Sequence, residues 1–107
     1  MDVYGAIADP TRREIIAMLA RGEKSAGDIA AKFNIAGPSV SRHLKVLRDS
    51  GLISFRAEAQ SRIYKLEAKK LQEAERWMRR QIDALHARFD ALEDHLNDMK
   101  KREERGG

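Results

Sequence analysis

The stretch Gly37–Gly51, GPSVSRHLKVLRDSG, predicts the helix around which the rest of the fold is arranged. Its apolar residues recur at i, i+4 and i+7 and therefore form one buried stripe: Val40, Leu44 and Leu47. Gly37 is an acceptable N-cap, Pro38 suits the first helical position, and Gly51 can close the C-terminus in a left-handed conformation. The predicted helix covers residues 37–50.

The face of this helix opposite the stripe carries small hydroxyls and cations. At ~100° per residue, Arg42 and Lys45 lie opposite the stripe, with the serines on its flanks. Arginine can pair bidentately with guanine, and serine can donate to or accept from base edges. The candidate DNA-binding residues of the helix are Gly37, Pro38, Ser39, Ser41, Arg42 and Lys45. An ordinary amphipathic surface helix has the same pattern. The neighbouring segments therefore decide between that interpretation and a helix that binds DNA.

The segment before this helix predicts a helix-turn-helix. Ser25 and Asp28 form an S-x-x-D capping box that opens a short helix over residues 25–33. Asn34, Ile35 and Ala36 then form a tight connection. A helix, a three-residue turn and a second helix is the spacing of that DNA-binding motif.

The segment after the helix predicts a β-hairpin, or wing, over residues 52–66. Residues 52–56 and 62–66 alternate apolar and polar side chains, with a short polar stretch between them. Four polar residues are expected near the tip, where a minor groove or phosphates attract arginine: Arg56, Gln60, Ser61 and Arg62. A surface hairpin with ordinary charges is the alternative.

The distribution of charge indicates a polyanionic partner. The 107-residue chain has a net charge of +4, and residues 36–66 hold six basic and two acidic side chains, which is the whole excess. The chain lacks cysteine, which excludes disulfides and thiolate metal sites. It shows no apolar run long enough for a membrane span and no signal peptide, so we expect a cytoplasmic protein without a membrane partner.

The N-terminal segment predicts two helices. A short one over residues 2–8 carries Val3 and Ile7, and a second over residues 10–20 begins after Asp9, which can cap it. Arg12 and Arg13 lie in the first turn of the second helix. They are either two solvated arginines or contacts to a phosphate backbone.

The last segment predicts a long helix that pairs with a second copy. Apolar residues at 3–4 spacing extend over ~29 residues, which makes a helix of ~43 Å that this small domain cannot cover alone. With Val3 and Ile7, these residues are the predicted homodimer contacts: Leu71, Met78, Ile82, Leu85, Phe89, Leu92, Leu96 and Met99. The predicted organisation is a DNA-binding domain over 1–67, a dimerisation helix over 68–102 and a disordered tail over 103–107.

The sequence resembles the ArsR-type winged-helix repressors. The resemblance covers about residues 3–66 in order and is carried by four segments: 8–13, 26–33, 38–47 and 51–53. It implies a mainly α fold with a small β-hairpin, five helices and a two-stranded wing. It also implies a homodimeric bacterial repressor that binds an inverted repeat in double-stranded DNA. In this family the positions matching Gly37, Ser39, Ser41 and Arg42 commonly face DNA, and the wing arginine matching Arg62 supports them.

The sequence departs from the family pattern in two places. Members often have Ser-Gln where this chain has Ala36-Gly37, so no target sequence is transferred. Metal-sensing members without cysteines use an Asp-x-His pair on the last helix, whereas the pairs here have i, i+3 spacing: Asp83 with His86, and His95 with Asp98. We therefore expect no metal and no cofactor, and no small-molecule effector is identified.

Two alternative functions stay open. One is a metal-responsive repressor with ligands on the last helix, and the other is a protein-interaction module that has lost sequence-specific DNA binding. An enzyme is not expected. Ser41 and His43 point in different directions on their helix and no third group orients them.

Overall fold

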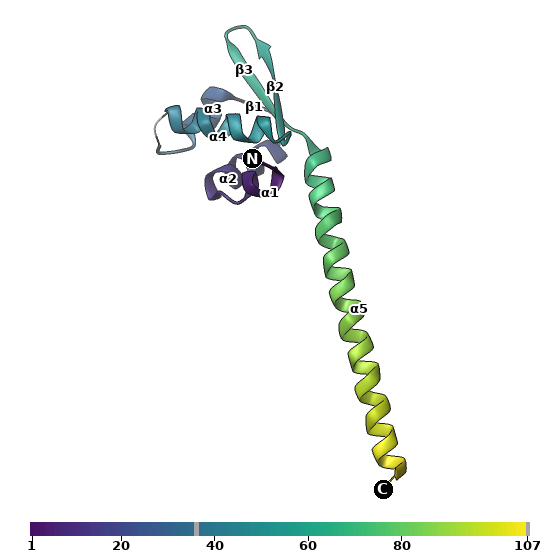
Figure 1. Cartoon of the computed structure of the whole chain (residues 1–107). Helices are drawn as coiled ribbons and strands as arrows, with labels where there is room; N and C mark the ends of the chain where they lie inside the picture. The colour runs from purple at the N-terminus through teal and green to yellow at the C-terminus, as the bar shows by residue number, and fades with distance from the viewer. Residues whose placement is uncertain (36, 107) are drawn as a thin grey trace. The chain divides into compact units, whose positions relative to one another are not determined.

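A computed structural model describes residues 1–35 and 37–106 of the chain (Figure 1). The chain divides into two compact units, Met1–Ala74 and Glu75–Gly107. The elements in order are α1 (Val3–Ile7), α2 (Pro10–Ala20), β1 (Lys24–Ser25), α3 (Ala26–Ala31), α4 (Gly37–Asp49), β2 (Ile53–Glu58), β3 (Ser61–Leu66) and α5 (Ala68–Gly106). The predicted fold class, mainly helical with a small β-hairpin, is confirmed.

The predicted starts of α2 and α3 are confirmed by their caps. The carboxylate of Asp9 accepts the backbone N–H of Arg12 at 3.1 Å, and the hydroxyl of Ser25 accepts the backbone N–H of Asp28 at 3.1 Å. The hydrogen bond from the Arg12 backbone lowers the pKa of Asp9, because it stabilises the ionised carboxylate. The connection predicted at 34–36 ends in Ala36, which lies outside the described residues.

Helix α4 buries the predicted stripe and ends as predicted. Val40, Leu44 and Leu47 are its buried residues. Gly51 has a φ of 81°, and two backbone bonds close the helix end: Gly51 N–H to the Arg48 carbonyl and Leu52 N–H to the Leu47 carbonyl, each 3.0 Å. The predicted N-cap at Gly37 is not seen, since α4 already includes Gly37 and the position before it lies outside the described residues.

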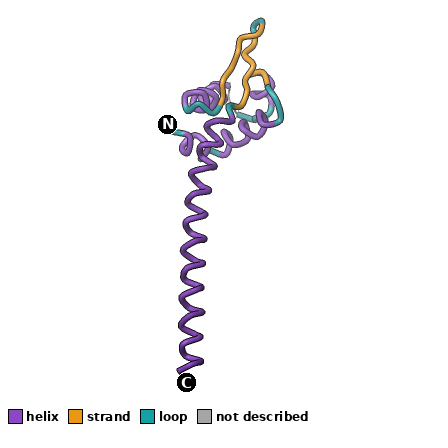
Figure 2. Tube along the Cα trace, turned by 90° about the vertical axis from the view of Figure 1, so that its right-hand side faces the viewer, coloured by secondary structure: helices purple, strands orange, loops and turns teal. Residues whose placement is uncertain are grey.

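The sheet has three strands, where the sequence predicts two. Its order is β1-β3-β2 and both pairings are antiparallel (Figure 2). In the added pairing Lys24 lies opposite Tyr64 and Ser25 opposite Ile63. A two-residue strand is too short to show an alternating pattern, and Ser25 also caps α3, so the local sequence predicts only a helix start there.

The two strands of the hairpin are longer and its turn is tighter than predicted. Glu58 pairs with Ser61, which leaves only Ala59 and Gln60 in the turn. Ala59 has a φ of 54° and is the single non-glycine residue of the described chain with a positive φ. A two-residue turn with positive φ at its first position normally has glycine there. Because this chain has alanine at that position, the sequence pattern does not indicate the turn.

The core of the first unit lies between the helices and the inner face of the sheet. It consists of Ala6, Ile15, Leu19, Ile29, Val40, Leu44, Leu47, Leu52, Ile53 and Tyr64. Val3, Ile7 and Leu71, three of the predicted dimer contacts, are partly buried against this core. Ala74 on the second turn of α5 is also buried.

The described part of the second unit, residues 75–106, is helical throughout and has no buried residue. Its predicted end differs from the structure, because the helix continues through residues 103–106, where a disordered tail is predicted. Glutamate and arginine are good helix formers, which explains the longer helix. Gly107, the last residue of the predicted tail, lies outside the described residues. No helix in the described chain is both long and apolar enough to cross a membrane.

Candidate nucleic-acid interface

The N-terminal half of α4 presents most of the predicted contact residues to solvent. Because the stripe of Val40, Leu44 and Leu47 faces the core, the opposite side of the helix stays free of the fold. Ser39 is half-buried, and the other predicted α4 residues are exposed: Gly37, Pro38, Ser41, Arg42 and Lys45. A Cβ atom at Gly37 would have no other atom of the fold within 4 Å, so a ligand can approach the start of the helix closely.

The cations around α4 and the wing fall into two groups. Three of them have carboxylate partners: Lys45, Arg56 and Lys65. Within the described part of the chain, Arg42, Arg48 and Arg62 form no ion pair. An uncompensated guanidinium attracts a phosphate more strongly than one already beside a carboxylate, so these three arginines are the positive centre of the surface.

Lys45 is held by its own helix. Its ammonium donates to Asp49, one turn later, at 2.7 Å. That hydrogen bond lowers the pKa of Asp49, because it favours the ionised carboxylate. Both side chains are more than half exposed, at 65% and 53%, so the pair can open in favour of another anion.

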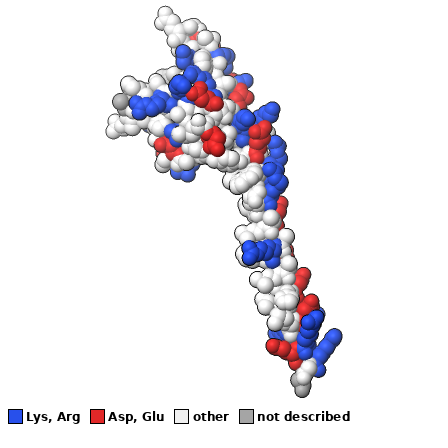
Figure 3. Space-filling model, in the orientation of Figure 1, with Lys and Arg blue, Asp and Glu red and all other residues white. Residues whose placement is uncertain are grey.

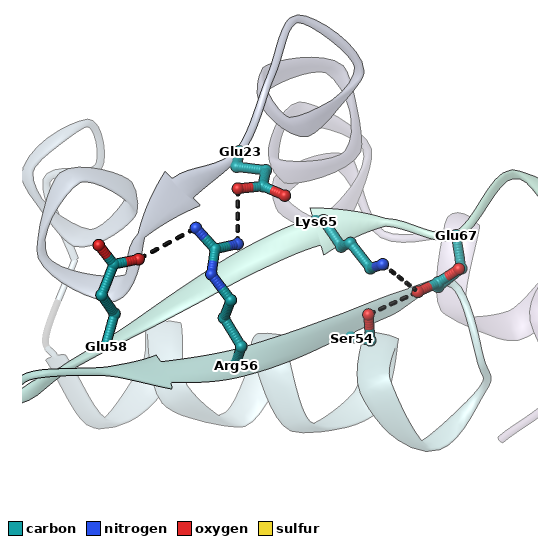
Figure 4. A network of polar contacts seen from close by, with 6 residues as sticks. All are labelled: Glu23, Ser54, Arg56, Glu58, Lys65 and Glu67. Atoms are coloured by element: carbon teal, nitrogen blue, oxygen red, sulfur yellow. Dashed lines mark hydrogen bonds and ion pairs between the residues drawn. The ribbon is translucent and has the colours of Figure 1, made fainter.

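Arg56 lies in a network on the outer face of the sheet (Figure 4). Its guanidinium donates to Glu23 at 2.6 Å and to Glu58 at 3.0 Å. The hydrogen bond to Glu23 is the main reason why the pKa of Arg56 is raised. On the same face Glu67 accepts from Ser54 at 2.6 Å and pairs with Lys65 at 3.7 Å. Of the predicted DNA-binding residues, Arg56 has the surroundings least suited to that role.

The register of the hairpin separates its two arginines. Phe55 pairs with Tyr64, so their side chains share one face of the sheet, and Arg62, two residues before Tyr64, lies on that face too. Arg56, next to Phe55, points to the opposite face. The guanidinium carbon of Arg62 lies 4.6 Å from the centre of the Phe55 ring, and that of Arg48 on α4 lies 5.3 Å from it. The Phe55 face therefore contacts α4.

Arg48 and Phe55 are the residues of this surface that the sequence analysis missed. Arg48 lies ~80° from the buried stripe on a helical wheel, on the same flank as Ser41, which is the flank facing Phe55. A cation over a ring joins residues from different elements, so no local pattern predicts it. The only indication in the sequence is a large aromatic residue on a strand of the wing, which is a weak one. In the structure Phe55 is 37% exposed.

Arg12 is not a solvated arginine, because its guanidinium is bonded within the protein. Its Nε donates to the Ala6 carbonyl at 2.6 Å and its Nη2 to the Gly5 carbonyl at 3.3 Å, while Nη1 lies 3.1 Å from His43 Nδ1. Because a guanidinium can only donate, His43 Nδ1 must accept. Arg12, which lies on α2, thereby connects this helix to α1 and to α4.

The charge on the wing is not at its end. In the face seen in Figure 3 the tip is white, and the blue side chains gather lower on the hairpin and beside it. Gln60 in the turn and Ser61 at the start of β3 are exposed and uncharged, as their predicted place near the tip requires. Arg62 follows as the cation of the Phe55 face nearest to the tip.

Among the described residues of the single chain, no group of three or more His, Cys, Asp or Glu side chains can hold a metal ion. This statement includes Asp83, His86, His95 and Asp98. A site formed by two chains would need a second copy and is a separate question.

The sequence profile of the bacterial regulatory protein, arsR family, matches residues 9–54. The chain is 44% identical over 77 residues to the transcriptional repressor SdpR of Bacillus subtilis, a match that covers 72% of this chain and 86% of SdpR. It is 39% identical over 90 residues to the biofilm growth-associated repressor of Agrobacterium fabrum, over 84% of this chain and 71% of that protein.

The fold gives the same result as the sequence matches. The crystal structure of an ArsR family transcriptional regulator superposes with a TM-score of 0.73 at 31% identity, covering 78% of this chain and 86% of that one. The chain therefore belongs to the ArsR family of bacterial transcriptional regulators and is not an enzyme.

Proposed function

We propose that the protein is a DNA-binding transcriptional repressor that acts as a homodimer on an inverted repeat. In this proposal the N-terminal half of α4 enters the major groove and the wing lies alongside the same duplex. The α4 residues that contact DNA are Gly37, Pro38, Ser39, Ser41, Arg42 and Lys45, and the wing contributes Gln60, Ser61 and Arg62. The site of action is the bacterial cytoplasm, where the chromosome lies.

The observation that carries the proposal is the set of three arginines on α4 and the wing that form no ion pair among the described residues. Arg42 projects from the exposed side of α4, and Arg48 and Arg62 lie over one ring beside it. The other cations of the region are neutralised within the protein. A polyanion that approaches α4 meets positive charge and small side chains, as a base-reading helix requires.

Dimerisation is supported by the apolar stripe of α5. Seven of its residues are exposed by between 41% and 56%: Met78, Ile82, Leu85, Phe89, Leu92, Leu96 and Met99. They repeat at the 3–4 spacing of a coiled coil, and a second copy offers the same stripe in return. Two α4 helices in such a dimer would read half-sites about one helical turn, ~34 Å, apart.

The test is the selection of bound duplexes from a random DNA library by the purified protein, without added metal or ligand. We expect an enriched inverted repeat. The variant Arg42→Ala should lower affinity about 10- to 100-fold per half-site and relax base preference at one position in each half-site, because a bidentate arginine–guanine pair contributes about 1–3 kcal/mol.

Arg79→Ala on α5 is the matched control, since it removes the same charge away from α4 and should leave the preferred sequence unchanged. If the folded wild-type protein enriches no sequence, the proposal fails and a protein-interaction role gains weight. If Arg42→Ala retains both affinity and base preference, the assignment of α4 as the reading helix is wrong.

A further inference from the structure

Phe55 occupies a position that core packing alone does not explain. It lies on β2 with 37% of its surface exposed, and its ring contacts the buried Tyr64 at 5.5 Å between centres with the planes tilted by 45°. The same ring lies beneath the guanidinium groups of both Arg48 and Arg62, at 5.3 Å and 4.6 Å. One aromatic side chain thus contacts two like charges from two elements.

These two cations could each have found a carboxylate. The other face of the same hairpin shows this alternative, since Arg56 there bonds to Glu23 and Glu58. Over an aromatic ring, a guanidinium is fixed in place while its charge is kept. The N–H groups of Arg48 and Arg62 also stay available, because neither side chain is paired with a carboxylate in the described part of the chain.

We propose that Phe55 is a positioning residue for DNA binding, which holds Arg48 at the end of α4 and Arg62 on the wing at a fixed separation. Each arginine then binds a backbone phosphate at the edge of the groove that α4 occupies. This inference rests on the proposed function and adds to it two phosphate contacts and the residue that orients them. It also assigns the wing contact to Arg62 and excludes Arg56, which lies on the opposite face in a closed ion-pair network.

The arrangement couples the wing to α4. β3 carries Arg62, β2 carries Phe55 and α4 carries Arg48, and Tyr64 supports the ring from within the core with only 3% of its surface exposed. A wing held in this way loses little conformational freedom when DNA binds. Ordering a free arginine side chain on binding costs entropy, so fixing two of them in advance increases affinity.

The experiment compares Phe55→Leu with Phe55→Trp in the full-length protein, using the selected duplex and fluorescence anisotropy over a range of salt concentrations. Leucine keeps apolar bulk and removes the ring, whereas tryptophan keeps the ring. We expect Phe55→Leu to weaken DNA binding by about five- to tenfold and Phe55→Trp to bind within about twofold of the wild type. Circular dichroism establishes that each variant is folded at the temperature of the measurement.

A double-mutant cycle separates positioning from a general structural role. In a background that carries Arg48→Ala and Arg62→Ala, Phe55→Leu should weaken binding by less than about twofold, because the residues it positions are absent. Arg62→Ala alone should reduce the slope of log affinity against log salt by about two, one for each copy in the dimer, whereas Arg56→Ala should leave it unchanged. The NMR shift of the Arg62 Nε–H group reports the ring contact without DNA.

Three outcomes would overturn the inference: wild-type affinity in folded Phe55→Leu, the same loss from Phe55→Leu in the arginine-free background, or a loss in Phe55→Trp as large as in Phe55→Leu. Failure of the proposed function is distinguishable. In that case the wild type itself binds no duplex. The chemical shift of the Arg62 Nε–H group would still differ between the wild type and Phe55→Leu, which would show the contact with the ring.

Discussion

At the scale of single residues, Arg12 connects more of the fold than any other polar side chain described above. Its guanidinium bonds to two carbonyls of α1 and to His43 of α4, and its own backbone N–H caps α2 through Asp9. The side chain is partly buried, so each lost contact leaves a carbonyl or a ring nitrogen with less access to water.

We predict that Arg12→Lys lowers the free energy of unfolding by about 1.5–3 kcal/mol, since one ammonium cannot replace three donors held in a planar fork. The measurement is urea denaturation followed by circular dichroism. Arg13→Lys is the matched control, because Arg13 is exposed beside it, and it should change the same quantity by less than about 0.5 kcal/mol. Equal effects of the two substitutions would show that the Arg12 contacts contribute little.

The local chemistry of several residues could be predicted from sequence, whereas their distant contacts could not. The caps at Asp9 and Ser25 and the left-handed glycine at 51 depend on neighbours within a few positions, and all three are confirmed. The contact between Arg12 and His43 joins residues 31 positions apart. Of the two interpretations of Arg12 available from the sequence, the solvated arginine is wrong, because its partners are set by tertiary packing. The contact to a phosphate backbone stays a prediction.

At the scale of elements, one intrahelical ion pair, Lys45 with Asp49, reduces the positive charge that α4 presents. Lys45 donates to Asp49, and Asp49 also places a negative charge at the C-terminal end of the helix, where the helix dipole disfavours it. The hydrogen bond from Lys45 lowers the pKa of Asp49, because it favours the ionised carboxylate. The pair therefore weakens the attraction between this side of α4 and phosphate.

We predict that Asp49→Asn strengthens binding to operator and random duplexes alike, by about three- to tenfold at physiological salt, because it frees Lys45 and removes a repulsive charge. Anisotropy titrations at several salt concentrations would also show a steeper salt dependence. Asp94→Asn on α5 makes the same change of net charge elsewhere and serves as the control. If both variants gain equally, the effect comes from net charge and not from α4.

The elements themselves could be predicted where they are long enough to show a repeated pattern of apolar residues. α2, α4 and α5 show several helical turns each, and their positions agree with the prediction within a few residues. β1 has two residues and depends entirely on its partner β3, so its local sequence carries no strand signal. For the candidate surface, the pattern predicted which α4 residues are exposed, but the register of β2 with β3 was needed to separate Arg56 from Arg62.

At the scale of the whole molecule, α5 has more apolar surface than its own chain covers. It runs for 39 residues; Leu71 on its first turn packs against the core, and Ala74 on its second turn is buried. Every described residue from 75 to 106 is exposed, including eight large apolar ones: Trp77 and the seven residues of the stripe. An exposed apolar stripe of this length normally marks an interface, which is why we propose a second copy as its partner.

The last prediction tests that proposal. Phe89 is 56% exposed in the middle of the stripe, so Phe89→Glu would place two unpaired carboxylates inside a dimer interface. Because burying an unpaired charge costs several kcal/mol, we expect dimer affinity to fall at least about 100-fold, seen by sedimentation equilibrium as a shift to monomer. Ala87→Glu adds the same charge on the outer side of the helix and should leave the dimer intact.

The same two variants connect assembly to function. A monomer has one α4 and one wing, so Phe89→Glu should lose most of its affinity for the inverted repeat and keep its weaker binding to an isolated half-site. Ala87→Glu should bind both duplexes as the wild type does. A dimer that persists in Phe89→Glu would place the interface outside the α5 stripe. A monomer that still binds the inverted repeat with full affinity would show that one copy is sufficient for recognition.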